Sequence, residues 1–261
     1  MRLQILFAAL CAAMLTAGAA QAAVKLQTVE YKQGDAALEG WLVYDDAVHG
    51  KRPGVVVYPA YWGPSAFEKG VAEKLAQMGY VAFVADIYGK GIRPDTPQTA
   101  GAAMGKFMSD RALLLARAQA AFDQLRHSDM VDTTKIAAIG YCFGGAPALD
   151  LARSGAPLVD VVTLHGALGT PTPDNAKNIK AHVLVLHGAA DPIVNAQAVA
   201  GFEKEMTDGH VADWQVVLYG GVMHAFTDNT HPSSPEHGTK YDATATRRSW
   251  QAMSDLFKNT L

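Results

Sequence analysis

The fold of this chain is decided by the stretch Lys135-Ile136-Ala137-Ala138-Ile139-Gly140-Tyr141-Cys142-Phe143-Gly144-Gly145. The apolar run at its start predicts a buried strand, and the glycines predict a sharp turn from that strand into a helix. A side chain at Gly140 or Gly144 would collide with neighbouring backbone in so tight a turn. The turn would hold Cys142 in a strained conformation at a helix N-terminus, where the helix dipole favours a thiolate.

The pattern G-x-C-x-G is the nucleophile turn of the α/β-hydrolase fold, with cysteine where serine usually stands. That fold predicts an acid and then a histidine further along the chain. Asp191 follows an apolar strand predicted over residues 182–186, and His224 follows a strand over 214–218. Ligand sites of such sheets gather beyond the carboxyl ends of the strands. Cysteine in a core, Asp-Pro in a turn and histidine in a surface loop are ordinary alternatives, but order and placement favour catalysis.

These three residues predict acyl transfer through a covalent intermediate. Cys142 would attack a carbonyl carbon as a thiolate and form a thioester. His224 would take the thiol proton and later activate water, while Asp191 would fix its tautomer. The oxyanion needs two N–H donors, for which we expect the backbone of Phe143 and of Tyr61, the latter in the loop after a strand near Val55.

Five ordered motifs between Pro53 and Phe226 resemble the dienelactone hydrolase family. They are Val55-Val56-Val57-Tyr58-Pro59-Ala60-Tyr61-Trp62-Gly63, Gly79-Tyr80-Val81-Ala82-Phe83-Val84-Ala85-Asp86-Ile87-Tyr88-Gly89-Lys90, Gly140-Tyr141-Cys142-Phe143-Gly144-Gly145, His187-Gly188-Ala189-Ala190-Asp191-Pro192 and His224-Ala225-Phe226. The resemblance implies an α/β-hydrolase with a Cys142-Asp191-His224 triad that hydrolyses a small ester or lactone without a cofactor.

Three departures from the family pattern bear on the substrate. Ala60 stands where the family commonly has a glutamate that gates the thiol, and Lys90 stands in place of one substrate-binding arginine. Lys90 keeps the charge but loses the bidentate geometry of arginine. Asp228 stands in place of a second arginine and would repel an anionic substrate. We therefore expect an uncharged or differently shaped ester, with Lys90 and Trp62 as substrate-binding residues. For Trp62, packing against Tyr61 is the equal alternative.

Residues 1–22 predict a secretory signal peptide, because Arg2 precedes an apolar core and Ala20-Gln21-Ala22 matches a cleavage site. A membrane anchor is the alternative, but the apolar core is short for a span. Cleavage would remove Cys11 and leave Cys142 as the only cysteine, so no internal disulfide could form. The export signal and the resemblance predict a bacterial periplasmic location, with full secretion as the alternative.

The remaining residues, 23–261, fit one α/β domain. Hydrophobic residues make up 49% of the chain and its formal net charge is -3. No basic patch with interleaved aromatics predicts nucleic-acid binding, and no glycine-rich loop predicts a nucleotide. The nine histidines are dispersed, so we expect no metal and no cofactor. After signal cleavage no segment predicts membrane insertion, and nothing in the sequence predicts an oligomeric state.

Alternating strands and helices predict a mostly parallel central sheet with helices on both faces. Strands 27–33 and 38–44 should form an opening antiparallel hairpin. Beyond them we expect strands near 55 and over 81–85, 135–139, 159–164, 182–186 and 214–218, and helices over 66–78, 110–126, 196–206 and 242–257. The segment 89–105 should be a surface loop able to act as a lid, and the segment 228–240 should rim the entrance. His165 and His187 should be structural.

The sequence therefore predicts a periplasmic cysteine-dependent hydrolase of an ester or lactone. Two other functions stay open. A non-catalytic binding or thiol-sensing protein on a hydrolase scaffold would be consistent with Ala60 and a lone thiol in an oxidising compartment. An acyltransferase would pass the thioester to an acceptor other than water.

Overall fold

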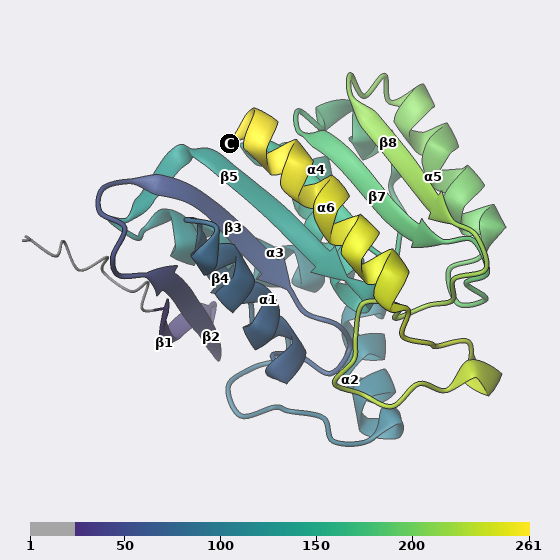
Figure 1. Cartoon of the computed structure of the whole chain (residues 1–261), viewed down its shortest axis with the longest axis horizontal. Helices are drawn as coiled ribbons and strands as arrows, with labels where there is room; N and C mark the ends of the chain where they lie inside the picture. The colour runs from purple at the N-terminus through teal and green to yellow at the C-terminus, as the bar shows by residue number, and fades with distance from the viewer. Residues whose placement is uncertain (1–23) are drawn as a thin grey trace, which may run out of the picture.

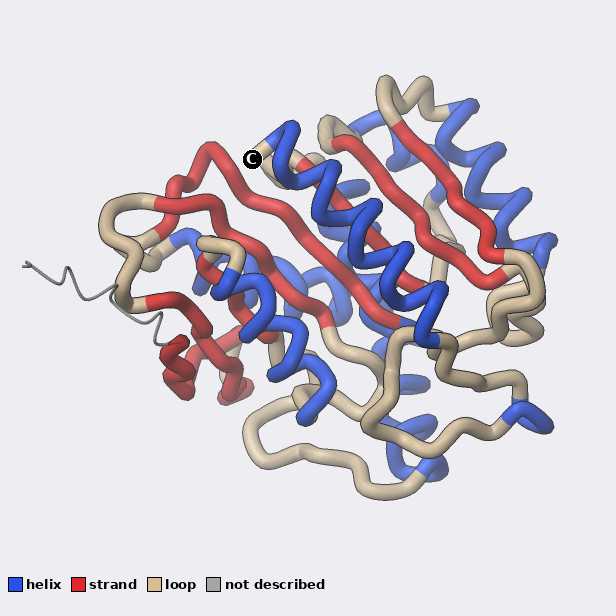
Figure 2. Tube along the Cα trace, in the orientation of Figure 1, coloured by secondary structure: helices blue, strands red, loops and turns tan. Residues whose placement is uncertain are grey.

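The computed structural model describes residues 24–261. Within them the chain forms an eight-stranded sheet in the order β1-β2-β4-β3-β5-β6-β7-β8 (Figures 1 and 2). The strands are β1 (Val24–Gln33), β2 (Ala36–Asp45), β3 (Arg52–Tyr58), β4 (Val81–Val84), β5 (Val131–Tyr141), β6 (Asp160–Leu164), β7 (His182–Gly188) and β8 (Trp214–Tyr219).

The two N-terminal strands form the predicted antiparallel hairpin. They turn at Gly34, whose φ of 55° suits glycine, and β2 also pairs antiparallel with β4. From β4 to β8 every neighbouring pair of strands is parallel. The carboxyl ends of β3, β5, β6, β7 and β8 therefore point to one edge, which confirms the predicted mostly parallel sheet.

Helices cover both faces of the sheet. They are α1 (Ala66–Gln77), α2 (Pro97–Ser109), α3 (Arg111–Arg126), α4 (Gly145–Arg153), α5 (Ala196–Asp208) and α6 (Ala243–Thr260), with short 3-10 helices over Cys142–Gly144, Pro173–Asn178 and Pro235–His237. Figure 1 shows α1 and α6 in front of the sheet and α3 and α4 behind it.

Alternation along the strands divides the core between these faces. In β3, Val55 and Val57 belong to the cluster that α1 and α6 cover, together with Leu75 and Phe257. Val56 belongs to the cluster that α3, α4 and α5 cover. Successive residues of a strand point to opposite faces, so a run without polar residues is what a doubly covered strand requires.

The prediction of a loop over residues 89–105 is wrong after residue 96, because α2 begins at Pro97. Thr96 caps the helix: its side chain accepts from the Thr99 N–H, while the Thr99 side chain accepts from the N–H of Thr96. Pro97 suits the first helical position because it has no N–H to satisfy. Pro97 and the small residues of the segment therefore start and continue a helix here, although such residues are also common in loops.

No helix among residues 24–261 has both the length and the apolar composition needed to cross a bilayer. The predicted signal peptide, residues 1–22, lies outside the described residues.

Candidate active site

Cys142 stands directly after β5 with a left-handed backbone, φ 52°. The glycines around it make this possible. A Cβ atom at Gly140 would lie 2.1 Å from the Gly144 carbonyl oxygen, and a Cβ at Gly144 would lie 2.1 Å from the Tyr58 carbonyl oxygen. Cβ atoms do not approach other heavy atoms this closely in proteins, so both positions must be glycine. The structure has the strained strand-to-helix turn that the sequence predicts, with the thiol half-buried at its tip.

The structure brings Asp191 and His224 together beyond the ends of β7 and β8. His224 Nδ1 donates to Asp191 Oδ2 at 2.7 Å, and both residues are buried. The Asp191 Oδ1 atom accepts from the N–H groups of Ile193 and Val194, at 2.8 and 2.9 Å. One carboxylate oxygen is thus fixed by backbone and the other is directed at the imidazole, which sets the histidine tautomer.

The opposite ring nitrogen of His224, Nε2, faces the third member of the predicted triad. It is buried and makes no well-aligned hydrogen bond within residues 24–261. Burial alone would lower the pKa of His224, but its interactions with Cys142 and with Asp191 raise it from 6.5 to about 10. The imidazole therefore holds a proton readily beside the Cys142 sulfur. A loosely aligned contact is common in a resting site and tightens with substrate.

Burial and charge act against each other at Asp191 too. Burial raises its pKa, but the hydrogen bond from His224 and that residue's charge outweigh burial, so the pKa lies below 3.8. His187 adds support, because its Nε2 bonds the Val194 carbonyl oxygen at 2.8 Å and lies 3.6 Å from Asp191 Oδ2. Burial lowers the pKa of His187. A neutral ring therefore braces the loop that carries the acid.

Backbone strain marks one further residue at the site, His165, for which we had predicted a structural hydrogen bond in preference to a catalytic role. Four non-glycine residues among those described have positive φ: Cys142, His165, His210 and Ala225. All but His210 line one cavity. The His165 ring packs edge-on against His224, with 5.1 Å between ring centroids, and its Nε2 lies 2.8 Å from Thr227 Oγ1. Residues of this kind cluster at functional sites, but the sequence signal, His-Gly after a strand, was too general to single out His165.

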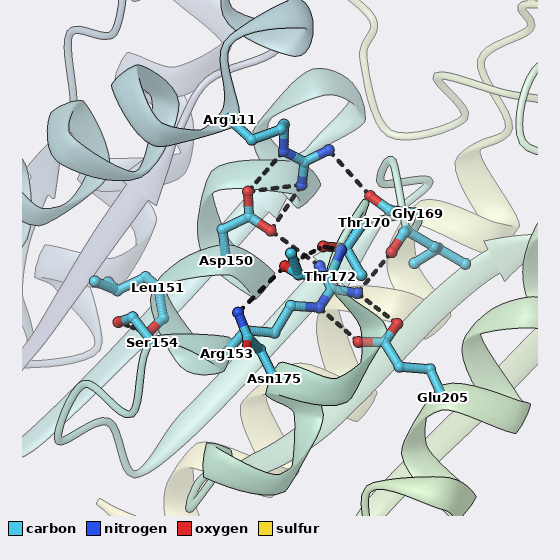
Figure 3. Close-up of polar contacts among 11 residues, drawn as sticks. Arg111, Asp150, Leu151, Arg153, Ser154, Gly169, Thr170, Thr172, Asn175 and Glu205 are labelled. Carbon is cyan, nitrogen blue, oxygen red and sulfur yellow. Dashed lines mark hydrogen bonds and ion pairs between the residues drawn. The ribbon is translucent and has the colours of Figure 1, made fainter.

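The loop that begins at His165 is held from behind by buried ion pairs (Figure 3). Arg153 on α4 binds both carboxylate oxygens of Glu205 on α5, at 2.7 and 2.8 Å, and donates to the Leu168 carbonyl oxygen at 2.8 Å. Arg111 on α3 binds Asp150 and the Gly169 carbonyl oxygen. On its other side, the Ala167 N–H donates to the Cys142 carbonyl oxygen at 2.9 Å. The network therefore ties three helices to the backbone behind the nucleophile.

The two predicted oxyanion donors occupy suitable positions. Phe143 lies at the start of the helix that follows the thiol, where N–H groups have no partner in the helix. Tyr61 lies in the loop after β3, and its N–H has no acceptor within residues 24–261. That loop is fixed by Glu68, which accepts from the N–H groups of Ala60 and Ser65, both at 3.0 Å. We had not predicted a role for Glu68, although Ser65-x-x-Glu68 is the recognised capping-box pattern.

A cavity of about 910 Å³ opens onto Tyr61, Cys142 and His224. It is lined mainly by apolar and aromatic atoms. The lining residues are Ala60, Tyr61, Trp62, Phe67, Pro94, Asp95, Pro97, Gln98, Met104, Cys142, His165, Ile193, His224, Ala225, Asp228, His231, Pro232, Ser234, His237 and Thr239. Both segments that we expected around the entrance, 89–105 and 228–240, contribute to it. Among the described residues, no lysine or arginine lines this cavity.

The prediction that Lys90 binds the substrate is wrong, because the structure places Lys90 outside the cavity. Its backbone N–H donates to the Ala37 carbonyl oxygen at 2.9 Å, which ties it to the N-terminal hairpin. Its exposed ammonium group pairs with Glu30. Trp62, by contrast, lines the cavity and packs beside Tyr61, with 4.6 Å between ring centroids.

Asp228 lines the cavity but does not present a free carboxylate to it. Its Oδ1 accepts from the Thr230 N–H at 2.8 Å and its Oδ2 lies 2.7 Å from His231 Nδ1. The His231 ring lies flat against Trp62, with 4.8 Å between centroids and 5° between planes. The Asp228 carboxylate is hydrogen-bonded to the neighbouring imidazole, which partly offsets the expected repulsion of an anionic substrate.

No group of three or more His, Cys, Asp or Glu side chains within residues 24–261 is arranged to hold a metal ion.

The comparisons with known proteins agree with this geometry. The model of the dienelactone hydrolase family matches residues 38–261. An Aquifex aeolicus protein named "putative carboxymethylenebutenolidase" is 28% identical over 90% of this chain and 99% of its own. A "probable 2-oxo-3-(5-oxofuran-2-ylidene)propanoate lactonase" of Bradyrhizobium sp is 29% identical over 70% of this chain and 76% of its own.

Among solved structures, a dienelactone hydrolase-like promiscuous phosphotriesterase from metagenomic libraries is 40% identical to this chain. It superposes with a TM-score of 0.86 over 91% of this chain and 99% of its own. The match to the family model spans strands β3 to β8 and includes Cys142, Asp191 and His224, and so this chain belongs to the dienelactone hydrolase family.

Proposed function

We propose that this protein hydrolyses an uncharged carboxylic ester or lactone through a thioester on Cys142. The observation that carries the proposal is the cavity, which joins the thiol, His224 and the free N–H of Tyr61 but has no cationic lining residue among those described. A substrate carboxylate would find no lysine or arginine there. The names of the Aquifex and Bradyrhizobium relatives support ester or lactone chemistry.

The reaction follows from the placement of the groups. The Cys142 thiolate attacks the carbonyl carbon, and the N–H groups of Phe143 and Tyr61 stabilise the oxyanion. The carbon–oxygen bond to the leaving group breaks as the His224 imidazolium gives that oxygen its proton, which leaves a thioester. Neutral His224 then takes a proton from water, whose oxygen attacks the thioester. The carbon–sulfur bond breaks, the acid leaves, and the thiolate and imidazolium are restored.

The experiment compares wild type, Cys142→Ala and Cys142→Ser on 4-nitrophenyl acetate and γ-butyrolactone. Turnover should fall at least 10³-fold in Cys142→Ala, with an unchanged circular dichroism spectrum and melting temperature. Full activity in Cys142→Ala would refute the mechanism. Faster acyl release with added alcohol or amine acceptors, with an ester or amide formed in place of the acid, would favour the acyltransferase. Absence of any turnover in wild type, together with redox-dependent ligand binding, would favour the sensor.

A phosphotriester is a second candidate substrate, and the absence of a lysine or arginine from the described cavity lining is the observation that favours it. A phosphotriester carries no net charge and offers a phosphoryl oxygen to the same donors, and the 40% identical neighbour is named for this activity. Diethyl 4-nitrophenyl phosphate tests it directly. Release of 4-nitrophenol in wild type and its loss in Cys142→Ala would support the assignment, and no release would exclude it.

We further propose export to the periplasm with cleavage after Ala22. Arg2, the apolar core and Ala20-Gln21-Ala22 support this proposal. Expression of the full chain in a Gram-negative host, followed by osmotic-shock fractionation and N-terminal sequencing, tests it. The mature chain should begin at Ala23 in the periplasmic fraction, and an intact Met1 in the cytosolic fraction would contradict the proposal.

A further inference from the structure

A second histidine–carboxylate pair lies at the cavity and is not used by the proposed reaction. It consists of Asp228 and His231, in the loop that follows the catalytic histidine; both line the cavity. His231 Nδ1 lies 2.7 Å from Asp228 Oδ2. The other carboxylate oxygen, Oδ1, accepts from the N–H and the hydroxyl of Thr230, at 2.8 and 2.7 Å. The carboxylate is therefore fixed before it binds the imidazole.

The imidazole ring is also held across its face. It stacks on Trp62, with 4.8 Å between centroids and planes 5° apart. Trp62 in turn packs against Tyr61, with 4.6 Å between centroids, and the Tyr61 backbone supplies a proposed oxyanion donor. The hydrogen bond to Asp228 holds one edge of the imidazole ring, and the stack on Trp62 holds one face. The side chain therefore loses little conformational freedom when a ligand binds.

This arrangement leaves one polar atom of the ring available. No residue among 24–261 forms a hydrogen bond with His231 Nε2, and the side chain is 31% exposed. A neutral imidazole that donates from Nδ1 to a carboxylate has its lone pair on Nε2. Nε2 is then a hydrogen-bond acceptor on a ring of fixed orientation, and this residue lines a cavity whose surface is mainly apolar. Sites of this kind gain specificity from a few fixed polar groups among apolar ones.

We propose that the Asp228–His231 pair is a substrate-binding subsite, at which Nε2 accepts a hydrogen bond from a hydroxyl or N–H group of the substrate away from the reacting carbonyl. The inference deepens the proposed function and rests on it. It assigns the substrate class as an uncharged ester or lactone that has an apolar body and one hydrogen-bond donor. A donor on the substrate is preferred over a bare alkyl group because the alkyl group would leave Nε2 desolvated and unpaired.

The test uses 4-nitrophenyl esters of hexanoic, 3-hydroxyhexanoic and 6-hydroxyhexanoic acid at pH 8.5, where imidazole is ordinarily neutral. His231→Phe keeps a flat ring against Trp62 but removes the acceptor. It should lower kcat/KM about 10-fold for at least one hydroxy ester and change the value for the hexanoate less than about 2-fold. His231→Gln, which restores an acceptor oxygen, should recover part of the loss. Equal changes for all three esters would overturn the proposal.

Asp228→Asn gives a sharper result because it should reverse the preference. The amide keeps the shape of the loop but presents an NH₂ group to Nδ1, so Nδ1 must accept and the proton moves to Nε2. The variant should favour 4-nitrophenyl 5-oxohexanoate, whose ketone accepts a hydrogen bond, over the hydroxy esters. An unchanged preference would contradict the assigned tautomer and with it the proposal.

A binding measurement separates this proposal from the catalytic one. Calorimetry measures how tightly methyl 6-hydroxyhexanoate and methyl 3-hydroxyhexanoate bind to Cys142→Ala and to the double variant that also carries His231→Phe. Neither variant should hydrolyse these esters. At least one hydroxy ester should bind about 10-fold more tightly to the single variant, while methyl hexanoate should bind both equally. No difference for either hydroxy ester would overturn the subsite even if Cys142 catalysis stands. A difference without esterase activity in wild type would refute the hydrolase alone.

Discussion

Two histidine–aspartate pairs have the same 2.7 Å separation, Asp191 with His224 and Asp228 with His231, and both histidines line the same cavity. They differ in burial. The side chains of the first pair are 4% exposed for histidine and 0% for aspartate, whereas those of the second are 31% and 10% exposed. They also differ in their neighbours: His224 interacts with Cys142, whereas His231 Nε2 has no hydrogen-bond partner among residues 24–261.

The difference shows that the donor–acceptor distance alone does not define a catalytic dyad. Burial strengthens the interactions of His224 with Cys142 and Asp191, since water no longer screens them. Burial itself lowers the pKa of His224, yet these two neighbours raise it to about 10. At the second pair, water reaches the ring, and its neighbours are Trp62 and the Thr230 hydroxyl. We expect the first pair to determine the rate and the second to determine which substrate is accepted.

The largest expected contrast comes from changing each aspartate to asparagine. Asp191→Asn would stabilise the wrong tautomer of His224 and remove the charge beside its cation, so kcat/KM should fall on the order of 10³–10⁴-fold. Asp228→Asn should change kcat/KM for 4-nitrophenyl acetate, which has no donor for the second pair, less than about 5-fold. Steady-state kinetics on this ester checks both, and similar losses would show that the two pairs share one role.

A smaller contrast should appear in the reactivity of the thiol without substrate. His224→Ala removes the cation that stabilises the Cys142 thiolate, so the rate of alkylation by iodoacetamide at pH 7 should fall at least about 10-fold. His231→Ala should leave this rate within about 2-fold of wild type. Quenched time courses followed by mass spectrometry give the rates. A fall in His231→Ala, or none in His224→Ala, would assign activation of the thiol to other groups.

The smallest effect is a shift in titration rather than a loss of activity. Cys142→Ala removes the anion that contributes most to the raised pKa of His224, so that pKa should fall from about 10 toward 6.5. A raised pKa stabilises the folded state fully below pH 6.5, and this contribution is lost as the pH rises through about 10. In Cys142→Ala the pKa of His224 should be lower, so this contribution to stability should be lost at a lower pH. NMR titration of the His224 ring, assigned with His224→Gln, checks the shift, and equal titration in both proteins would contradict the ion pair.

The fold could be predicted from the sequence wherever periodicity and glycine spacing are strong. Gly140 and Gly144 mark the nucleophile turn because no other residue fits there. The apolar run of β3 indicates a strand covered on both faces. The α2 segment was missed beyond Thr96 because proline and small residues are compatible with both a loop and the start of a helix. Only the capping contacts of Thr96 and Thr99 decide between them.

The site could be predicted only as far as local motifs reach. Asp191 and His224 follow strand ends and so could be placed at one edge of the sheet. The outward position of Lys90 depends on its bond to Ala37, which lies far away in the sequence. The role of His165 depends on packing against His224, and that of Asp228 depends on a partner three residues later. No motif records such tertiary contacts, although the capping-box pattern could have indicated Glu68.

The thioester on Cys142 is tested most directly by mass spectrometry of the protein quenched in acid during turnover of 4-nitrophenyl acetate. We expect an increase in mass by one acetyl group, located on the peptide that contains Cys142, which decays when substrate is exhausted and is absent in Cys142→Ala. Turnover without an acetylated Cys142, or with the acetyl group on another residue, would contradict the thioester mechanism.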